Sequence, residues 1–255
     1  MQKNFILLFF IFLLFAYCSF SQNADSSKNT TQFSGSVSVT NNGISIVPSF
    51  SLGKPAAIFN FSMGKNRFSF EPDLRFSLAG KPWSFLFWFR YHLIKKDKFT
   101  VNIGAHPALN FREQTVVLNG ATKKVMITRR YLAAELSPNY AIGKKVNVGM
   151  YYLFSKGLDD GTINTTHFIT FNTSVSNIKL SKQIFMRLAP QVYYLKLDAE
   201  DGYFFSSSIS FNKKNFPIAV SALMNKIIHT NISSSKNFIW NASLTYSFNH
   251  KYIKI

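Results

Sequence analysis

The segment Phe238-Ile-Trp-Asn-Ala-Ser-Leu-Thr-Tyr-Ser-Phe248 decides the fold, because apolar and polar side chains alternate along it. Consecutive side chains of a β-strand point to opposite faces. Leu244, Tyr246 and Phe248 therefore share one face, and the polar residues between them share the other. The same alternation recurs through most of the chain before this segment. We expect strands that each have one apolar and one polar face.

The N-terminal residues have the features of a secretory signal peptide. Lys3 supplies the positive charge, an apolar run follows from Phe5 to Ala16, and the stretch from Ser19 to Ser21 offers small residues at a cleavage site. The run is shorter than the roughly 20 apolar residues that a transmembrane helix needs. We predict that residues 1–21 are removed by cleavage before Gln22.

The composition favours strands with lipid on one face and water on the other. Phenylalanine and tyrosine number 28 and 11, yet the mean hydropathy is +0.03. Within a bilayer only helices and closed barrels satisfy all backbone hydrogen-bonding groups, and no later apolar run has the length of a helical span. The sequence therefore predicts an all-β fold, an antiparallel transmembrane β-barrel in the outer membrane. Because Cys18 leaves with the signal peptide, we expect no disulfides or cysteine chemistry in the mature chain.

The alternating segments divide the chain into about twelve candidate strands, whose lengths suit tilted membrane crossings. They are residues 44–52, 56–63, 67–78, 83–94, 99–112, 126–141, 146–155, 166–178, 184–197, 203–212, 217–228 and 237–248. The predicted organisation is a signal peptide at 1–21, an N-terminal periplasmic segment at 22–43, a barrel at 44–248 and a tail at 249–255. The periplasmic segment holds a strand-like piece, residues 33–40, whose pairing the sequence leaves open.

The connections between the candidate strands assign the two sides of the membrane. Every second connection is tight and carries lysine, at 64–66, 95–98, 143–145, 179–183 and 213–215. The others include the long ones, at 113–125, 156–165, 198–202 and 229–236. Outer-membrane barrels have short periplasmic turns and longer outer loops, so both chain ends are expected in the periplasm.

The alternation also sorts the charged side chains. In the strand at 67–78 the aromatic and aliphatic residues share one face, so the charged residues must point into the barrel, and the other strands follow the same rule. The predicted lumen is lined by Glu71, Asp73, Arg75, Arg90, His92, His106, Arg112, Arg129, Glu135 and Arg187. Tight hairpins would bring Glu71 near Arg90 and His106 near Trp88, although a slip of one residue would reverse the faces of a strand.

The net charge of +18 suits nucleic acid, anionic lipid or an acidic solute. Export argues against nucleic acid, so we expect outer-membrane lipid and lipopolysaccharide as partners, with small anionic solutes as a further class. Acidic residues gather on the predicted outer loops, where they either recruit divalent cations or keep the loops solvated: Glu113, Asp159, Asp160, Asp198, Glu200 and Asp201. Their spacing is unlike that of a calcium loop, and we expect no metal and no cofactor.

Enzymatic chemistry would need a nucleophile, a base and an orienting group within reach of one another. Serines are abundant on the inward faces, and His92 or His106 could act as a base, but serine is also the usual filler of such faces. Outer-membrane lipid hydrolases place a polar pair on the lipid-facing surface, where His167 is the one outward histidine and matches no motif. We expect no enzyme, and a lipid hydrolase remains the third hypothesis.

The end of the chain resembles a known signal. Leu244, Tyr246 and Phe248 are similar to the C-terminal sequence that the outer-membrane assembly machinery reads in bacterial barrels, although that sequence usually ends the protein and here residues 249–255 follow. More generally, residues 44–248 resemble bacterial outer-membrane β-barrel proteins of undetermined function. The resemblance implies the barrel fold and the assembly machinery as a partner.

The inward excess of arginine over acidic residues favours a narrow channel for small anionic solutes. The alternative is a closed structural or interaction barrel that transports nothing, because ten ionisable groups in a small lumen can also form a web of salt bridges. The sequence leaves open the solute, the state of the lumen and the oligomeric state.

Overall fold

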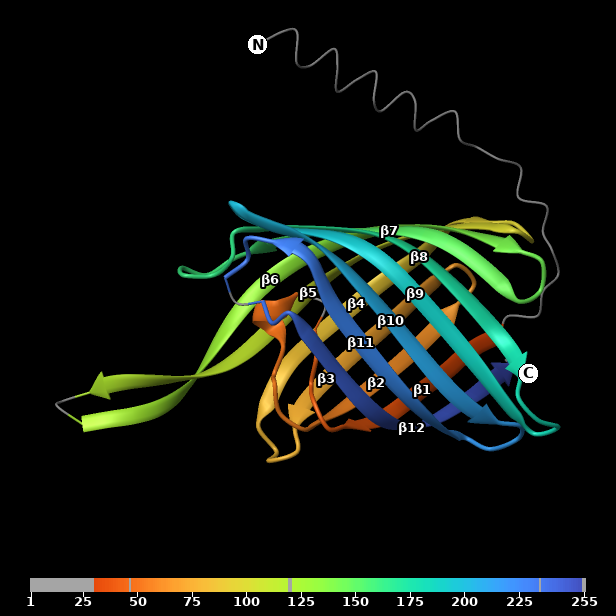
Figure 1. The fold of residues 1–255 in the computed structure, drawn as a ribbon, viewed down its shortest axis with the longest axis horizontal. Helices are drawn as coiled ribbons and strands as arrows, with labels where there is room; N and C mark the ends of the chain where they lie inside the picture. The colour runs from red at the N-terminus through yellow and green to blue at the C-terminus, as the bar shows by residue number, and fades with distance from the viewer. Residues whose placement is uncertain (1–29, 46, 119–120, 234, 254–255) are drawn as a thin grey trace, which may run out of the picture.

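A computed structural model describes residues 30–45, 47–118, 121–233 and 235–253. Over these residues, twelve antiparallel strands form a closed barrel in which each strand pairs with its neighbours in the sequence and β1 pairs with β12 (Figure 1). The strands are β1 Thr30–Thr40, β2 Ala56–Lys65, β3 Phe68–Ser77, β4 Pro82–Lys95, β5 Phe99–Leu118, β6 Ala121–Ile142, β7 Val146–Gly157, β8 Thr165–Lys179, β9 Ile184–Leu197, β10 Glu200–Lys213, β11 Ile218–Thr230 and β12 Phe238–Ile253. The described residues include no helix with the length and apolar character to cross a membrane.

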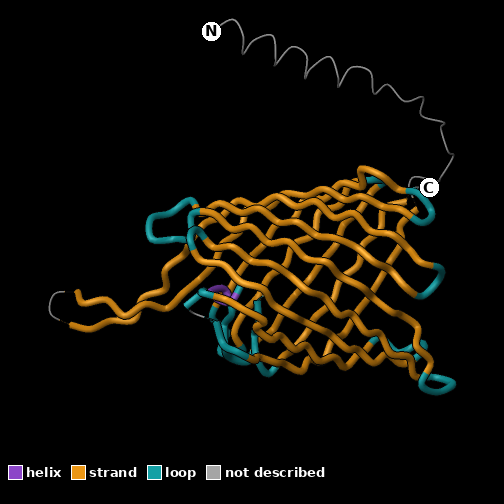
Figure 2. The backbone as a smooth tube through the Cα atoms, turned by 45° about the horizontal axis from the view of Figure 1, so that its top comes forward, coloured by secondary structure: helices purple, strands orange, loops and turns teal. Residues whose placement is uncertain are grey.

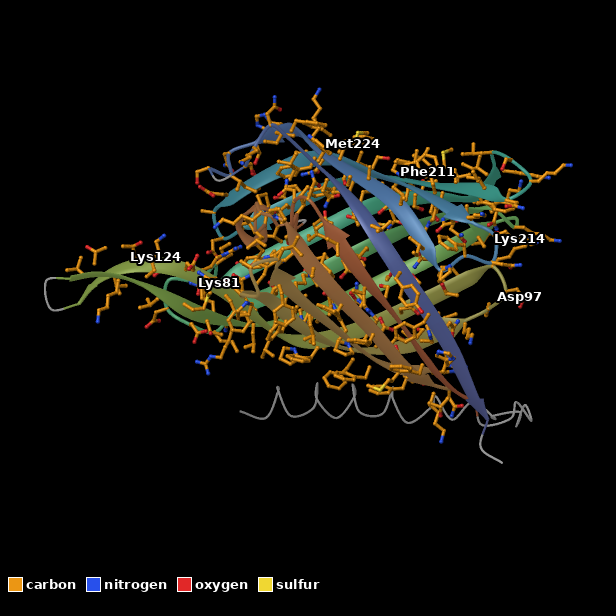
Figure 3. All side chains as sticks on the ribbon, turned by 90° about the horizontal axis from the view of Figure 1, so that it is seen from below. Lys81, Asp97, Lys124, Phe211, Lys214 and Met224 are labelled. Atoms are coloured by element: carbon orange, nitrogen blue, oxygen red, sulfur yellow. The ribbon has the colours of Figure 1, made fainter. Side chains whose placement is uncertain are left out.

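The predicted faces of the strands are confirmed. On β4, Phe89, Tyr91 and Leu93 are exposed on the outer surface, whereas Trp88 and Arg90, at alternate positions, face an internal cavity. Large apolar side chains are exposed on the other strands as well, for example Phe211 and Met224 (Figure 3). So large an exposed apolar surface marks a contact with an apolar environment, and around a closed barrel that environment is lipid.

The connections alternate between the two ends of the barrel. Tight turns join β2 to β3, β4 to β5, β6 to β7, β8 to β9 and β10 to β11 at one end, which we call the turn end. Asp97 and Lys214 mark it in Figure 3, and Lys81 and Lys124 mark the opposite loop end. The described end of β12 lies at the turn end, because Ile253 pairs with Thr30 and the neighbouring Thr31 pairs with Lys65. The assignment of the turn end to the periplasm remains a prediction from loop length.

The expected start of the barrel at residue 44 is wrong. Residues 33–40 belong to β1, which pairs with β2 on one side and with β12 on the other along its whole length. Among the described residues the barrel therefore begins at Thr30, and residues 30–40 of the expected N-terminal segment at 22–43 belong to it. Without β1 the edges of β2 and β12 would present unpaired backbone groups to lipid, which closure prevents. The predicted cleavage site and signal peptide lie outside the described residues.

The expected strand at 44–52 does not form. Residues 41–55, which we call the inner loop, connect β1 to β2 and contain a short 3-10 helix at Pro48–Phe50, purple in Figure 2. Pro48 cannot donate to a strand ladder and its fixed φ suits the first turn of a helix. Gly43 closes the loop, since its amide donates to the carbonyl of Lys54 at 2.8 Å and its carbonyl accepts from the amide of Leu52 at 2.8 Å.

The ends of two strands also differ from expectation. β12 continues to Ile253 and pairs with β1 up to that residue, so residues 249–253 are strand and not a tail. β5 pairs with β4 only as far as Asn110, and β6 pairs with β7 only from Tyr131. The described residues of the expected loop at 113–125 instead form a two-stranded ribbon that projects from the loop end (Figures 1 and 2).

Candidate functional site

The barrel encloses a cavity of about 780 Å³ that extends from the inner loop into the turn-end half of the lumen. Its two walls differ in character. The wall of β12, β1 and β2 carries mainly small polar residues, namely Ser34, Ser36, Asn60, Ser62, Ser247 and Asn249, and also includes Phe61 and Phe248. The wall of β3 to β7 carries larger charged and aromatic residues, including Glu71, Asp73, Arg75, Trp88, Arg90, His106, Tyr131 and Tyr151.

Arg90 is the centre of an ion-paired network on the second wall. Its Nε donates to Oε1 of Glu135 at 2.5 Å, and its Nη1 contacts Oε2 of Glu71. The hydroxyl of Tyr151 donates to the other oxygen of Glu135 at 2.7 Å, and the hydroxyl of Ser69 donates to Glu71 at 2.7 Å. The Glu135 side chain is only 2% exposed, so its charge depends on these partners.

Gly104 makes the contact between Arg90 and Glu135 possible. Arg90 lies on β4 and Glu135 on β6, and Gly104 on the intervening β5 is the register partner of both. A Cβ atom at Gly104 would lie 2.9 Å from Oε1 of Glu135 and 3.1 Å from Cγ of Arg90. The ion pair therefore crosses β5 over a position that has no side chain.

A second ion pair lies on β3 alone. Arg75 and Asp73 are two residues apart and so share the inward face, where Nη2 of Arg75 donates to Oδ2 of Asp73 at 2.6 Å and Nε donates to Oδ1 at 2.9 Å. The guanidinium of Arg75 also lies 5.3 Å from the ring centre of Trp83. The carboxylate is thus bound in the bidentate geometry that arginine favours.

Aromatic contacts complete this wall. The rings of Trp88 and His106 lie 3.9 Å apart, and the guanidinium of Arg90 lies 4.3 Å from the ring centre of Trp88. The expected proximities of Glu71 to Arg90 and of Trp88 to His106 are therefore confirmed. Both follow from the register of β3, β4 and β5, in which Glu71 is paired with Trp88.

The ten residues expected in the lumen do not form a single site. Glu71, Asp73, Arg75, Arg90 and His106 line the cavity, and Glu135 contacts it through Arg90. His92 lies nearer the turn end and bonds Asn102 at 2.6 Å. Arg112 and Arg129 lie on β5 and β6 where the ribbon leaves the barrel. Arg187 lines a separate cavity at the turn end, with Lys213 and Lys214.

No protein-family model and no curated protein sequence matches the chain. Solved structures match it along most of its length. The KdgM porin in complex with disordered oligogalacturonate is 9% identical with a TM-score of 0.50, covering 85% of this chain and 99% of that one. The NanC porin is 11% identical with a TM-score of 0.48, covering 87% and 100%. An outer membrane channel from Pseudomonas putida F1 is 8% identical with a TM-score of 0.46, covering 90% and 100%.

The chain is an outer-membrane β-barrel. The similarity to the KdgM porin is one of fold, and it agrees with the closed topology and with the apolar outer surface. The expected fold class, general resemblance and location in the outer membrane are confirmed.

At the loop end, an apolar cluster that the alternation did not predict packs inside the lumen of the outer-membrane barrel. The cluster contains Val47, Phe168, Tyr193, Leu195, Leu197, Phe204 and Ile232. Some of its strands carry apolar residues on both faces, as in the run from Val192 to Leu195 on β9, and such runs are the signal that could have indicated inward packing.

The inner loop contacts both this cluster and the wall of β3 to β7, which we call the charged wall. Val47 packs within the cluster, and Phe50 packs against it and against the ring of Tyr131 at 5.0 Å. The fully buried Trp83 donates from Nε1 to the carbonyl oxygen of Phe50 at 2.7 Å. These contacts hold the loop inside the barrel, above the cavity.

The acidic residues of the loop end have separate partners. Glu113 pairs with Lys81 at 2.5 Å, and Asp159 pairs with Arg130 at 2.6 Å. Hydrogen bonds from Arg130 lower the pKa of Asp159. Among the residues that the structure describes, no group of three histidine, cysteine, aspartate or glutamate residues is arranged to hold a metal ion.

Proposed function

We propose that the protein is a narrow channel for small hydrophilic solutes, constricted by the inner loop. The observation that carries the proposal is the cavity of about 780 Å³, which has small polar residues on one wall, charged and aromatic residues on the other, and lies directly below that loop. The arginines of the cavity pair with carboxylates on their own or nearby strands and do not cross to the opposite wall of small polar residues. The salt bridges therefore line the lumen and do not fill it.

Any preference for anions would arise at the two mouths of the lumen. Within the cavity, Arg75 and Arg90 are balanced by the carboxylates that bind them. The other inward arginines lie at the ends, with Arg112 and Arg129 at the loop end and Arg187 at the turn end. Positive charge at a narrow mouth raises the local concentration of anions. The preferred solutes are therefore small and anionic, although the cavity itself is close to neutral.

Planar bilayers containing the purified barrel test this proposal. We expect small conductance steps and a reversal potential that favours anions under a salt gradient. Arg112→Gln combined with Arg129→Gln should reduce the preference for anions and leave the steps in place, whereas Lys144→Gln with Lys145→Gln in a turn should change it less. A protein that gives no steps at any salt concentration would contradict the channel.

A closed barrel is the second candidate, because the apolar cluster and the inner loop both lie in the loop end of the lumen. Replacing residues 47–50 with glycine and serine distinguishes a channel from a closed barrel. A channel should conduct before the replacement and conduct more after it. A closed barrel should conduct only after it.

We also propose that Leu244, Tyr246 and Phe248 are read by the outer-membrane assembly machinery. Leu244 and Tyr246 are exposed on the lipid-facing side of β12, the strand that closes the barrel against β1. Replacing Tyr246 and Phe248 with serine should slow assembly into membranes in a reconstituted assembly assay, whereas the same change at Phe211 should have less effect.

A lipid hydrolase would need a serine bonded to one of the candidate histidines, and no such pair is found among the described residues. His167 bonds Tyr152 at 2.9 Å, and His106 stacks on Trp88 and lies 3.3 Å from the carbonyl oxygen of Pro107. We therefore propose no enzymatic activity. Lipid cleavage by the purified barrel that is lost in His106→Ala or His167→Ala would contradict this.

A further inference from the structure

The outer surface of β7 to β10 changes character step by step towards the loop end. Register partners across these strands form three successive rows, because residues two apart on a strand share a face. The lowest row is apolar, with Met150, Phe171 and Val192. The next is mainly aromatic, with Tyr152, Ile169, Tyr194 and Tyr203. The third contains Phe154, His167, Lys196 and Asp201.

This order locates the outer edge of the hydrocarbon layer. Aromatic residues of membrane barrels gather at the boundary between acyl chains and headgroups, with apolar residues below them. The tyrosine row therefore lies at that boundary on the loop-end side. The side chains of His167, Lys196 and Lys156 lie just beyond it, at the level of lipid headgroups. We call these three residues the rim patch.

The three residues of the rim patch are close neighbours. His167 and Lys196 are register partners on β8 and β9, and Lys156 is the register partner of Thr165, two residues from His167 on the same face. Side chains related in this way lie about 5 to 8 Å apart. Lys156 and Lys196 are exposed, and His167 is half-buried. A single headgroup can therefore contact all three.

The hydrogen bond of His167 prepares it to donate. Its Nδ1 lies 2.9 Å from the hydroxyl of Tyr152, and the two rings are stacked. When the hydroxyl donates to Nδ1, the proton of the neutral imidazole is on Nε2. The patch then presents two ammonium groups and one imidazole N–H, which are all donors.

The nearby acidic residues have other partners and form no ion pair with the two lysines. Asp159 pairs with Arg130, and Asp198 accepts hydrogen bonds from the backbone amides of Asn164 and Thr165 at 3.0 and 2.7 Å. Asp201, which lies opposite Lys196, accepts from the hydroxyl of Tyr194 at 2.8 Å. In the described part of the chain, neither Lys156 nor Lys196 has a carboxylate oxygen within 4.0 Å.

We infer that the rim patch binds the phosphate groups of an outer-leaflet lipid. Phosphate is the anionic group that lipids carry directly above their acyl chains, and ammonium and imidazole N–H groups are suitable donors to it. The apolar and tyrosine rows below the patch provide the surface for the acyl chains of the same molecule. This continuity favours a lipid headgroup over free phosphate. The inference concerns the outer surface and is independent of the proposed channel.

Binding to diphosphoryl lipid A and to the same lipid after removal of its phosphates tests the inference, with the full barrel in detergent and native mass spectrometry as the readout. We expect the phosphorylated lipid to be retained at least about fivefold better, since each lysine near a membrane surface adds about 1 kcal/mol of attraction. Lys156→Gln combined with Lys196→Gln should abolish that preference. Lys95→Gln combined with Lys98→Gln, at the turn end, is the matched control and should keep it.

Three results would overturn the inference. The first is an unchanged preference in the Lys156 and Lys196 variant, and the second is an equal loss in the control. The third is complete displacement of the lipid by millimolar inorganic phosphate, which would show a site for free phosphate. Heat-dependent migration on gels checks that each variant is folded, and conductance in bilayers, which the inference predicts to be unchanged, distinguishes its failure from failure of the channel.

Discussion

The charged wall of β3 to β7 and the apolar cluster at the loop end of β8 to β10 are both inward-facing, yet they have opposite effects on the lumen. Along the charged wall, Arg90 and Arg75 lie against their own side of the barrel and leave a cavity beside the small residues of β1 and β12. At the cluster, Phe168 and Phe204 pack together with Val47 of the inner loop. The same strand geometry thus gives an open or a packed interior, according to whether the inward side chains pair with one another along the wall or are covered by residues of the inner loop.

The largest effect is expected from Phe204→Ala, which removes a side chain that is 1% exposed from the centre of the cluster. Loss of a buried phenylalanine costs about 3 to 5 kcal/mol. Urea unfolding of the barrel in lipid vesicles, followed by tryptophan fluorescence, measures the change in the free energy of unfolding. Phe211→Ala on the lipid-facing surface of the same strand is the control, and an equal loss there would show that the cluster is not a packing centre.

On the charged wall, Glu135→Ala should destabilise the barrel more than Glu71→Ala. Both carboxylates bind Arg90, but the side chain of Glu135 is 2% exposed and that of Glu71 is 29% exposed. Removing one partner of a buried pair costs about 3 kcal/mol, and the cost is smaller where water can replace the lost partner. The same unfolding measurement checks the order. A reversed order would mean that Glu71 is the principal partner of Arg90.

A smaller loss is expected from Gly104→Ala, because the new methyl group would force Arg90 and Glu135 apart. Overpacking of this kind costs about 1 to 3 kcal/mol. Gly64→Ala is the matched control, since a Cβ atom there would have its nearest neighbours at an ordinary 3.7 Å. Equal effects of the two substitutions on the free energy of unfolding would argue against an ion pair of Arg90 and Glu135 that crosses β5 at Gly104.

The smallest effect concerns the loop between β7 and β8. The pKa of Asp159 is lowered by hydrogen bonds from Arg130, so the ionised carboxylate is the form that the folded loop binds. The stabilisation is complete above the ordinary carboxyl pKa of about 3.9 and is lost as the pH falls through the lowered value. Hydrogen exchange of residues 158–164, corrected for the intrinsic rate, should therefore increase in acid. Asp159→Asn should remove this dependence, and an unchanged pH profile in that variant would contradict it.

The predicted residues differ in how well the sequence located them. The inward positions of Glu71, Arg90 and His106 follow from alternation, which is a local property of a strand. Their contacts follow from tight turns, which fix the register of neighbouring strands. Arg112, Arg129 and Arg187 also occupy inward-facing positions of their strands, but they lie at the ends of the lumen. Alternation decides which face of a strand a side chain lies on. The position of that residue along the barrel axis depends on where the strand enters the membrane.

The sequence by itself determined the alternation, and with it the two faces of the strands, the closed barrel and the lipid-facing surface. Only the tertiary structure decided which segment closes the barrel and which enters it. Residues 33–40 and 44–52 both resemble short strands, but one forms β1 and the other lies in the inner loop. The physical reason is that closure depends on partners more than 200 residues away, as in the pairing of Val37 with Tyr246. No local pattern contains that information.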